Sequence, residues 1–97
     1  MEASVMLKVK YTPIAIQDLN AGYDYIYSEN PVAARQVIER IEQMVIHLKS
    51  QPFMGHAGRV EETYEVYVPN TPFIIFYQVS SELLVIVSIL HTARKYP

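Results

Sequence analysis

The sequence contains no cysteine and no tryptophan. Without cysteine, disulfides and thiolate metal sites are excluded, and a reducing compartment is allowed. His47 and His56 stand apart from any second pair of ligand-type side chains, so we expect no metal site. No motif indicates a cofactor, and none is expected.

Long hydrophobic runs are also missing. The longest apolar runs, FIIFY and LLVIV, fall far below the roughly 20 residues that a membrane span needs. The opening residues, MEASVMLKVK, lack the charged-then-apolar order of a signal peptide. We therefore expect a cytoplasmic protein without a membrane partner.

Positive charge is scarce as well. Eight Lys and Arg residues stand against ten Asp and Glu residues, which gives a formal net charge of −2. No Lys or Arg lies between Val60 and Ala93. Nucleic-acid binding draws on clustered cations that release counterions from phosphates. The charge balance therefore argues against direct binding of DNA or RNA by this chain.

The composition itself is globular, with 51% hydrophobic and 19% charged residues. The chain has 97 residues. A chain of this size buries roughly 60–70% of its unfolded surface, which supports one stable core. We expect a single domain over residues 1–97, with residues 1–5 as a flexible N-terminus.

Two predicted helices begin in the same way, with a residue whose side chain can cap the helix followed by a proline. At Thr12–Pro13 and Asn30–Pro31, the cap can accept an orphan backbone N–H, and the proline loses no hydrogen bond. Apolar residues then recur at spacings of three and four, which predicts two amphipathic helices. The first stripe consists of Ile16, Leu19, Tyr23, Ile26 and Tyr27, and the second of Ala34, Val37, Ile38, Ile41, Val45 and Leu48. We expect the helices to pair as a hairpin.

Strands are expected on both sides of this hairpin. Residues 6–11 alternate apolar and basic side chains, and residues 63–68 alternate as a half-exposed strand with Glu65 and Tyr67 on the wet side. Residues 50–59 show no periodicity and should connect the helices to the sheet. Residues 73–79 and 83–90 are apolar on both faces, as central strands are. The order β-α-α-β-β-β predicts an α+β fold in which the helical hairpin packs on one face of a mainly antiparallel sheet.

Five short motifs occur in order along the chain: A..DL...YDYI from Ala15, NP.AA from Asn30, GRV from Gly58, VP.TPF from Val68, and ILH..R..P from Ile89. Through them, residues 6–97 resemble the RelE/ParE superfamily of bacterial toxins, in its plasmid-stabilisation branch. The resemblance implies the α+β fold predicted above. It also implies a type II toxin–antitoxin module, in which an antitoxin from the adjacent gene holds the toxin inactive until the antitoxin is degraded, and contact with DNA comes only through that antitoxin.

The superfamily that the sequence resembles has two activities. RelE-type members cut messenger RNA in the ribosome with basic residues on the central strands, whereas ParE-type members poison DNA gyrase by protein contact. An RNA-cleaving site depends on positioned cations and a proton shuttle. The three predicted strands between Glu61 and Leu90 carry no Lys or Arg, and Tyr64 stands where the related branch usually has Arg. We therefore favour a ParE-like toxin of gyrase over a ribosome-dependent mRNA endonuclease, which leaves open whether the chain is an enzyme.

Residues near the end of the sequence could serve the endonuclease alternative. His91 could shuttle a proton, Arg94 could meet a phosphate, and Tyr96 could complete a minimal catalytic set. Each also has a structural interpretation. His91 could be a hydrogen-bonded group at a strand end, Arg94 a clamp for a carboxylate, and Tyr96 a ring that anchors the tail on the core.

Contact with the target or the antitoxin is predicted for Arg59, Tyr64, Arg94 and Lys95. Arg59 lies in a predicted loop, where functional residues concentrate, although a surface salt bridge with Glu61 or Glu62 would equally explain it. Lys95 could equally be a solvated charge. Helical spacing turns Tyr25 away from the first apolar stripe, toward an antitoxin or toward solvent.

Overall fold

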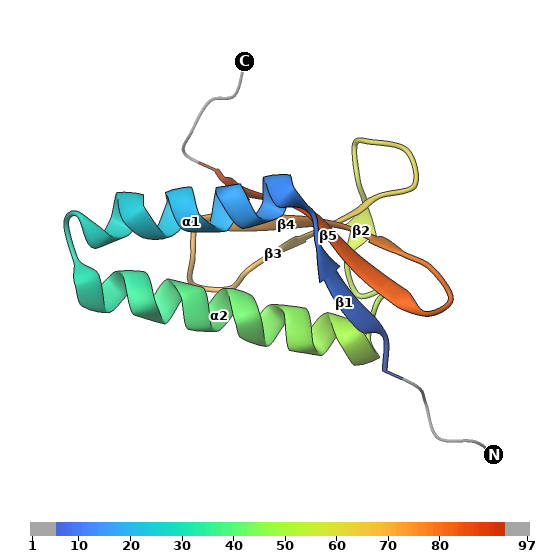
Figure 1. Ribbon diagram of the computed structural model, residues 1–97. Coiled ribbons are helices and arrows are strands. Elements are labelled where there is room, and N and C mark those ends of the chain that lie inside the picture. Colours follow the sequence, from blue (N-terminus) through green and yellow to red (C-terminus); the bar gives the residue numbers. More distant parts are fainter. Residues whose placement is uncertain (1–5, 93–97) are drawn as a thin grey trace.

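The computed structural model describes residues 6–92, which form two helices and a five-stranded sheet (Figure 1). The elements are β1 (Lys8–Tyr11), α1 (Pro13–Tyr27), α2 (Pro31–Ser50), β2 (His56–Ala57), β3 (Tyr64–Tyr67), β4 (Phe73–Val79) and β5 (Leu83–His91). The predicted α+β fold and its order of elements are confirmed, with one correction. β2, two residues long, lies in the stretch that was expected to be a plain connection. The predicted flexible segment, residues 1–5, lies outside the described residues.

Both helices begin where the sequence predicts. The Thr12 hydroxyl accepts a hydrogen bond from the Ala15 N–H at 3.0 Å, and the Asn30 side chain accepts one from the Ala33 N–H at 3.1 Å. The Thr12 hydroxyl also donates to the Val87 carbonyl at 2.8 Å, which ties the start of α1 to β5. Each cap satisfies a backbone donor that the first helical turn would otherwise leave unpaired. These bonds place α1 against the sheet.

The sheet has the strand order β1-β5-β4-β3-β2. From β1 the chain passes through the helical hairpin to the far edge of the sheet, and then returns by antiparallel pairing from β2 to β5. β5 then pairs with β1 in parallel. A parallel pair needs a long connection, and the two helices are part of that connection. As Figure 1 shows, α1 and α2 lie side by side over the sheet.

The core lies between this hairpin and the sheet. On α2 the buried residues are Ala34, Val37, Ile41, Met44, Val45 and Leu48, which confirms the predicted stripe except for half-buried Ile38 and adds Met44. On α1 the prediction is partly wrong, because Ile16 and Tyr27 are exposed and the buried residues are Ala15 and Gly22. Phe73 packs directly on Gly22, since a carbon of its ring lies 2.8 Å from where a Cβ on Gly22 would be. Small residues let α1 approach the sheet closely.

No described helix is both long enough and apolar enough to cross a membrane.

Candidate functional site on the helix-free face of the sheet

A groove of about 210 Å³ lies on the face of the sheet that the helices leave uncovered. We call it the sheet groove, and its lining includes Arg59, Tyr67, Ile74, Phe76, Leu90 and His91. Cross-strand pairing explains this grouping, since Ile74 pairs with Tyr67 on one side and with Leu90 on the other. Residues directly opposite each other on neighbouring strands point to the same face. The groove therefore has an apolar floor.

Arg59 is held at the sheet groove by its ion pair with Glu65. The Glu65 carboxylate accepts hydrogen bonds from the Arg59 backbone N–H at 2.8 Å and from Arg59 Nε at 3.1 Å. The Arg59 side chain is 70% exposed, whereas that of Glu65 is 8% exposed. Two predictions are therefore wrong. Glu65 is buried on its strand, and it replaces Glu61 and Glu62 as the partner of Arg59.

The buried carboxylate of Glu65 stays ionised because of Arg59. Burial alone raises the pKa of Glu65, but the hydrogen bonds from the Arg59 backbone and side chain, together with the charge of Arg59, outweigh it. The net result is a pKa below the usual value of 4.5. A buried charge is tolerated when it is paired and hydrogen-bonded. The charge on Arg59 is correspondingly compensated within the protein.

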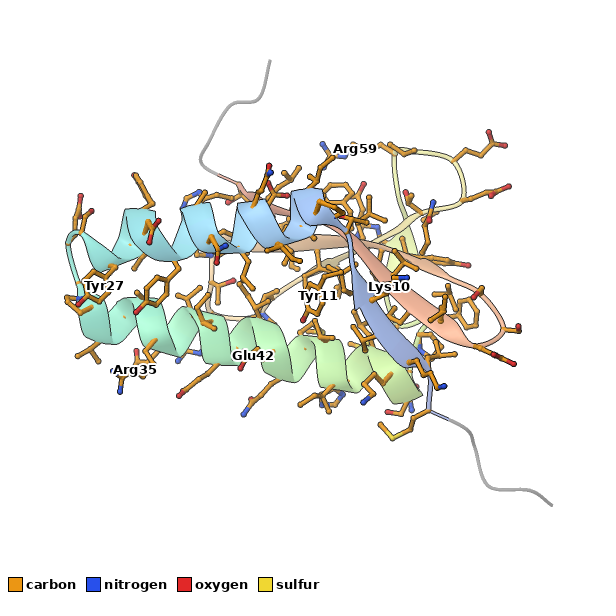
Figure 2. The ribbon with its side chains drawn as sticks, in the orientation of Figure 1. Lys10, Tyr11, Tyr27, Arg35, Glu42 and Arg59 are labelled. Carbon is orange, nitrogen blue, oxygen red and sulfur yellow. The ribbon has the colours of Figure 1, made fainter. Side chains whose placement is uncertain are left out.

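The guanidinium of Arg59 also lies over an aromatic ring. Its central carbon is 5.6 Å from the centre of the Phe76 ring. This cation–π contact and the bonds to Glu65 hold the guanidinium at the edge of the sheet groove. Figure 2 shows Arg59 well away from Arg35, which projects outward from α2.

His91 ends β5 and lines one end of the sheet groove. It is only 8% exposed, and its ring meets the rings of Phe73 and Tyr25 edge to face, at centroid distances of 5.0 and 5.6 Å. Tyr25 is exposed, as the helical spacing predicts. Just before His91, the Asp18 carboxylate accepts bonds from Ser88 and the Ile89 N–H at 2.9 and 3.0 Å. α1 thereby fixes the end of β5.

The other predicted site residues do not join this group. Tyr64 stacks on Tyr77 with a centroid distance of 5.5 Å and packs against the helix-facing core. Arg94, Lys95 and Tyr96 lie outside the described residues. Arg59 and His91 are thus the predicted residues that line the sheet groove, although the ring of His91 is turned toward Phe73 and Tyr25 on the helix side.

Several residues of the site were not predicted as functional. Glu65 anchors Arg59, and the groove lining also includes Tyr67, Ile74, Phe76 and Leu90. The signal that could have identified Glu65 is a single acidic residue inside an otherwise apolar and aromatic strand, six positions after an arginine. Tyr67 stands two positions after Glu65 and pairs with Ile74, which places it on the helix-free face.

No cluster of metal-ligating side chains occurs among residues 6–92. The donor set of the sheet groove agrees, because it offers one imidazole and one arginine around apolar side chains. The sheet groove thus presents mainly apolar and aromatic side chains.

Comparison with known proteins identifies the chain's family. Residues 9–96 match the family described as ParE toxin of type II toxin-antitoxin system, parDE. Toxin RelE2 of Caulobacter vibrioides is 35% identical over 89 residues, which cover 92% of this chain and 99% of that protein.

Solved structures share the fold. The chromosomal ParDE system from P. aeruginosa superimposes with a TM-score of 0.80 at 24% identity, covering 91% of this chain and 98% of that one. The toxin–antitoxin complex RelBE2 from Mycobacterium tuberculosis gives a TM-score of 0.64 at 21% identity, covering 97% and 100% of the two chains. The chain therefore belongs to the ParE toxin family, within the RelE/ParE superfamily, and is the toxin component of a type II toxin–antitoxin system.

Proposed function

We propose that an antitoxin from the adjacent gene holds this toxin inactive, and that the released toxin stops growth in the cytoplasm by binding a protein target. DNA gyrase is the first candidate for that target. The sheet groove would form the contact. The observation that supports this proposal is the state of Arg59, whose charge at the groove is already matched by buried Glu65.

Phosphoryl transfer needs positive charge that is free to meet the phosphate. Loss of one preorganised electrostatic contact typically costs about 10²–10³ in rate. Strands β3, β4 and β5 carry no Lys or Arg, and the guanidinium of Arg59 is directed to Glu65. The groove thus lacks the charge that stabilises a pentavalent phosphate, within the residues described.

The same groove suits a protein partner. Interfaces concentrate tyrosine, phenylalanine and arginine at their centres, and these residues dominate binding energy. Tyr67 is 59% exposed beside the apolar floor formed by Ile74, Phe76 and Leu90. Tyrosine has only two side-chain torsions, so ordering it on binding costs little entropy.

A ribosome-dependent mRNA endonuclease is the second candidate. It is favoured by the relative that carries a RelE name and by the position of His91 at the end of the groove. An imidazole there could transfer a proton, since histidine is the side chain most often used as a general acid or base. Arg94 and Tyr96 would have to supply the remaining groups.

A paired experiment distinguishes the two candidate functions. Purified toxin is added to gyrase with supercoiled plasmid, and separately to translating ribosomes with a defined message. We expect stalled gyrase–DNA complexes and an intact message. Message cut in the ribosomal A site, with loss of cutting in Arg94→Ala, would overturn the proposal in favour of the endonuclease.

Variants then locate the contact. Tyr67→Ala should weaken the effect on gyrase at least about tenfold, since buried aromatic anchors are interface hot spots. Tyr27→Ala removes another exposed tyrosine, on α1 and away from the groove, and serves as the control. Equal loss of activity in both variants would contradict a contact centred on the sheet groove.

A further inference from the structure

A second groove, larger than the sheet groove, lies along α2. Its volume is about 400 Å³, and its lining includes Arg40, Gln43, Met44, His47, Met54 and Asn70. We call it the α2 groove. None of the residues that make the sheet groove lines it.

One wall of the α2 groove is polar and has no negative charge. Arg40, Gln43 and His47 follow one another on α2 at helical spacing, so they share one side of the helix. An Arg40 guanidinium nitrogen lies 3.4 Å from the Asn70 carbonyl oxygen, which keeps the arginine at the rim. No Asp or Glu belongs to the lining of this groove.

Glu42, one of the two acidic residues of α2, lies on another side of the helix. Glu42 lies toward Tyr11 of β1, where burial first and then the charge of Glu42 raise the pKa of the Tyr11 phenol. Figure 2 shows Glu42 on α2 near Tyr11. On a chain with a net charge of −2, the lining of this groove thus carries the positive charge of Arg40 and no carboxylate.

The remaining surface of the α2 groove is apolar and adaptable. Met44 is buried against the core, while Met54 is 48% exposed in the segment after α2. Neighbouring Phe53 is also exposed. Methionine is unbranched and polarisable, so it fits apolar side chains of varied shape. The groove therefore combines an apolar floor with a basic rim.

The two grooves are adjacent along the chain. Tyr67 lines the sheet groove, and Asn70 lines the α2 groove. Asn70 has a φ of 62°, in the left-handed region, within the turn between β3 and β4. Three residues span at most about 10 Å. A ligand segment could therefore cross this turn and occupy both grooves.

We propose that the α2 groove binds a segment of the antitoxin in which carboxylates flank an apolar anchor. This inference rests on the antitoxin proposed above. A stable interface buries at least about 1,000 Å², which is more than a contact with the small sheet groove provides. The basic rim selects acidic side chains, and the adjacency of the grooves lets the same segment reach the sheet groove.

Charge reversal tests this proposal on the toxin–antitoxin complex. The probe is the protein encoded beside the toxin gene, and its affinity for the purified toxin is measured at low and physiological salt. Arg40→Glu should raise the Kd at least about tenfold and weaken the salt dependence, because like charges at an interface repel. Arg35→Glu makes the same change on an exposed site of α2 outside the groove and should leave the Kd within about twofold.

A second variant separates charge from structure. Gln43→Glu adds a negative charge to the α2 groove without removing the bond between Arg40 and Asn70, and it should also raise the Kd. In growing cells, both groove variants should stay toxic and be poorly neutralised by the antitoxin. Unchanged affinity in both groove variants would overturn the inference, and so would lost toxicity with normal antitoxin binding. If the wild-type toxin does not bind the antitoxin at all, the antitoxin proposal fails first.

Discussion

The two faces of the sheet differ in what lies over them. On the face toward the helices, the buried residues of β4 and β5 include Ile75, Tyr77, Leu84 and Ile86, all with no measurable exposure. On the opposite face, Arg59 and Tyr67 stand at the surface above Phe76 and Ile74. The face toward the helices is covered by packed side chains, whereas the opposite face carries an ion pair and aromatic rings at its surface.

β4 shows the difference within a single strand. Its first five residues, Phe73 to Tyr77, are all buried, yet alternate side chains point to opposite faces. Phe76 lies beneath the guanidinium of Arg59, and Ile74 pairs with Tyr67 and Leu90. Packing against the helices covers one face, while side chains such as Arg59 and Tyr67 stay exposed on the free face.

The largest expected effect on stability comes from replacing a leucine by alanine on each face in turn. Leu84→Ala on the covered face should cost about 2–5 kcal/mol of unfolding free energy, since it leaves a cavity in a fully buried position. Leu90→Ala on the free face should cost about 1 kcal/mol, because Leu90 is only half buried. Urea unfolding of both variants measures the difference.

Leu90→Ala should instead weaken target binding, because Leu90 forms part of the groove floor. A Leu90→Ala variant as unstable as Leu84→Ala, with full activity on the target, would remove the distinction between the faces.

Glu65→Gln tests the ion pair of the free face. At neutral pH the variant should be less stable by about 1–3 kcal/mol, since hydrogen bonds to a charged group are lost. The folded pKa of Glu65 is lowered from 4.5, so its contribution is fully present above that value and disappears as the pH falls through the folded pKa. Thermal unfolding of both proteins from neutral to acidic pH measures this.

The difference in stability between wild type and Glu65→Gln should therefore disappear at acidic pH. Because other carboxylates titrate in both proteins, the difference between the two curves isolates Glu65. A gap that stays constant below the usual pKa of Glu65 would mean that the carboxylate is not held ionised by Arg59.

The covered face could be predicted from the sequence, since local signals determine it. Thr12 and Asn30 cap the helices as expected, and the α2 stripe and the two central strands lie where their periodicity places them. β2 was missed because a strand of two residues is too short to show an alternating pattern of apolar and polar side chains. The α1 stripe was partly wrong because close packing on Phe73 selects small residues, which a hydrophobic pattern does not register.

The free face could be predicted only in part. Arg59 and His91 were identified by residue type and position, and both line the sheet groove. The partner of Arg59 was not found, because alternation placed Glu65 on a wet face and proximity favoured Glu61 and Glu62. Burial of a charge depends on contacts between separate strands, and no local pattern reports it.

Gly22→Ala probes how closely α1 approaches the covered face. In an exposed helix this change gains about 1 kcal/mol of helix propensity. Here the new methyl group would lie 2.8 and 2.9 Å from two carbons of the buried Phe73 ring, and overpacking typically costs about 1–3 kcal/mol. We expect a net loss of about 1 kcal/mol by chemical denaturation. Recovery of that loss in Gly22→Ala with Phe73→Leu would assign it to the ring, whereas a stabilised single variant would contradict the close approach.

The smallest expected effect compares tyrosine hydroxyls on the two faces. On the covered face, the buried Tyr77 hydroxyl accepts a hydrogen bond from the Gly55 N–H at 3.1 Å, and burial is the main cause of its raised pKa. Tyr77→Phe leaves that N–H unpaired and should cost about 0.5–1.5 kcal/mol. Tyr67→Phe on the free face removes an exposed hydroxyl and should change stability by less than about 0.5 kcal/mol.

Both Tyr→Phe variants keep the ring, so thermal unfolding compares the hydroxyls alone. Hydrogen exchange adds a local measurement, because the Gly55 amide should exchange faster in Tyr77→Phe and at the wild-type rate in Tyr67→Phe. If the two variants lose the same stability, the hydroxyl of Tyr77 is not a structural bond, and the covered face depends on apolar packing alone at this position.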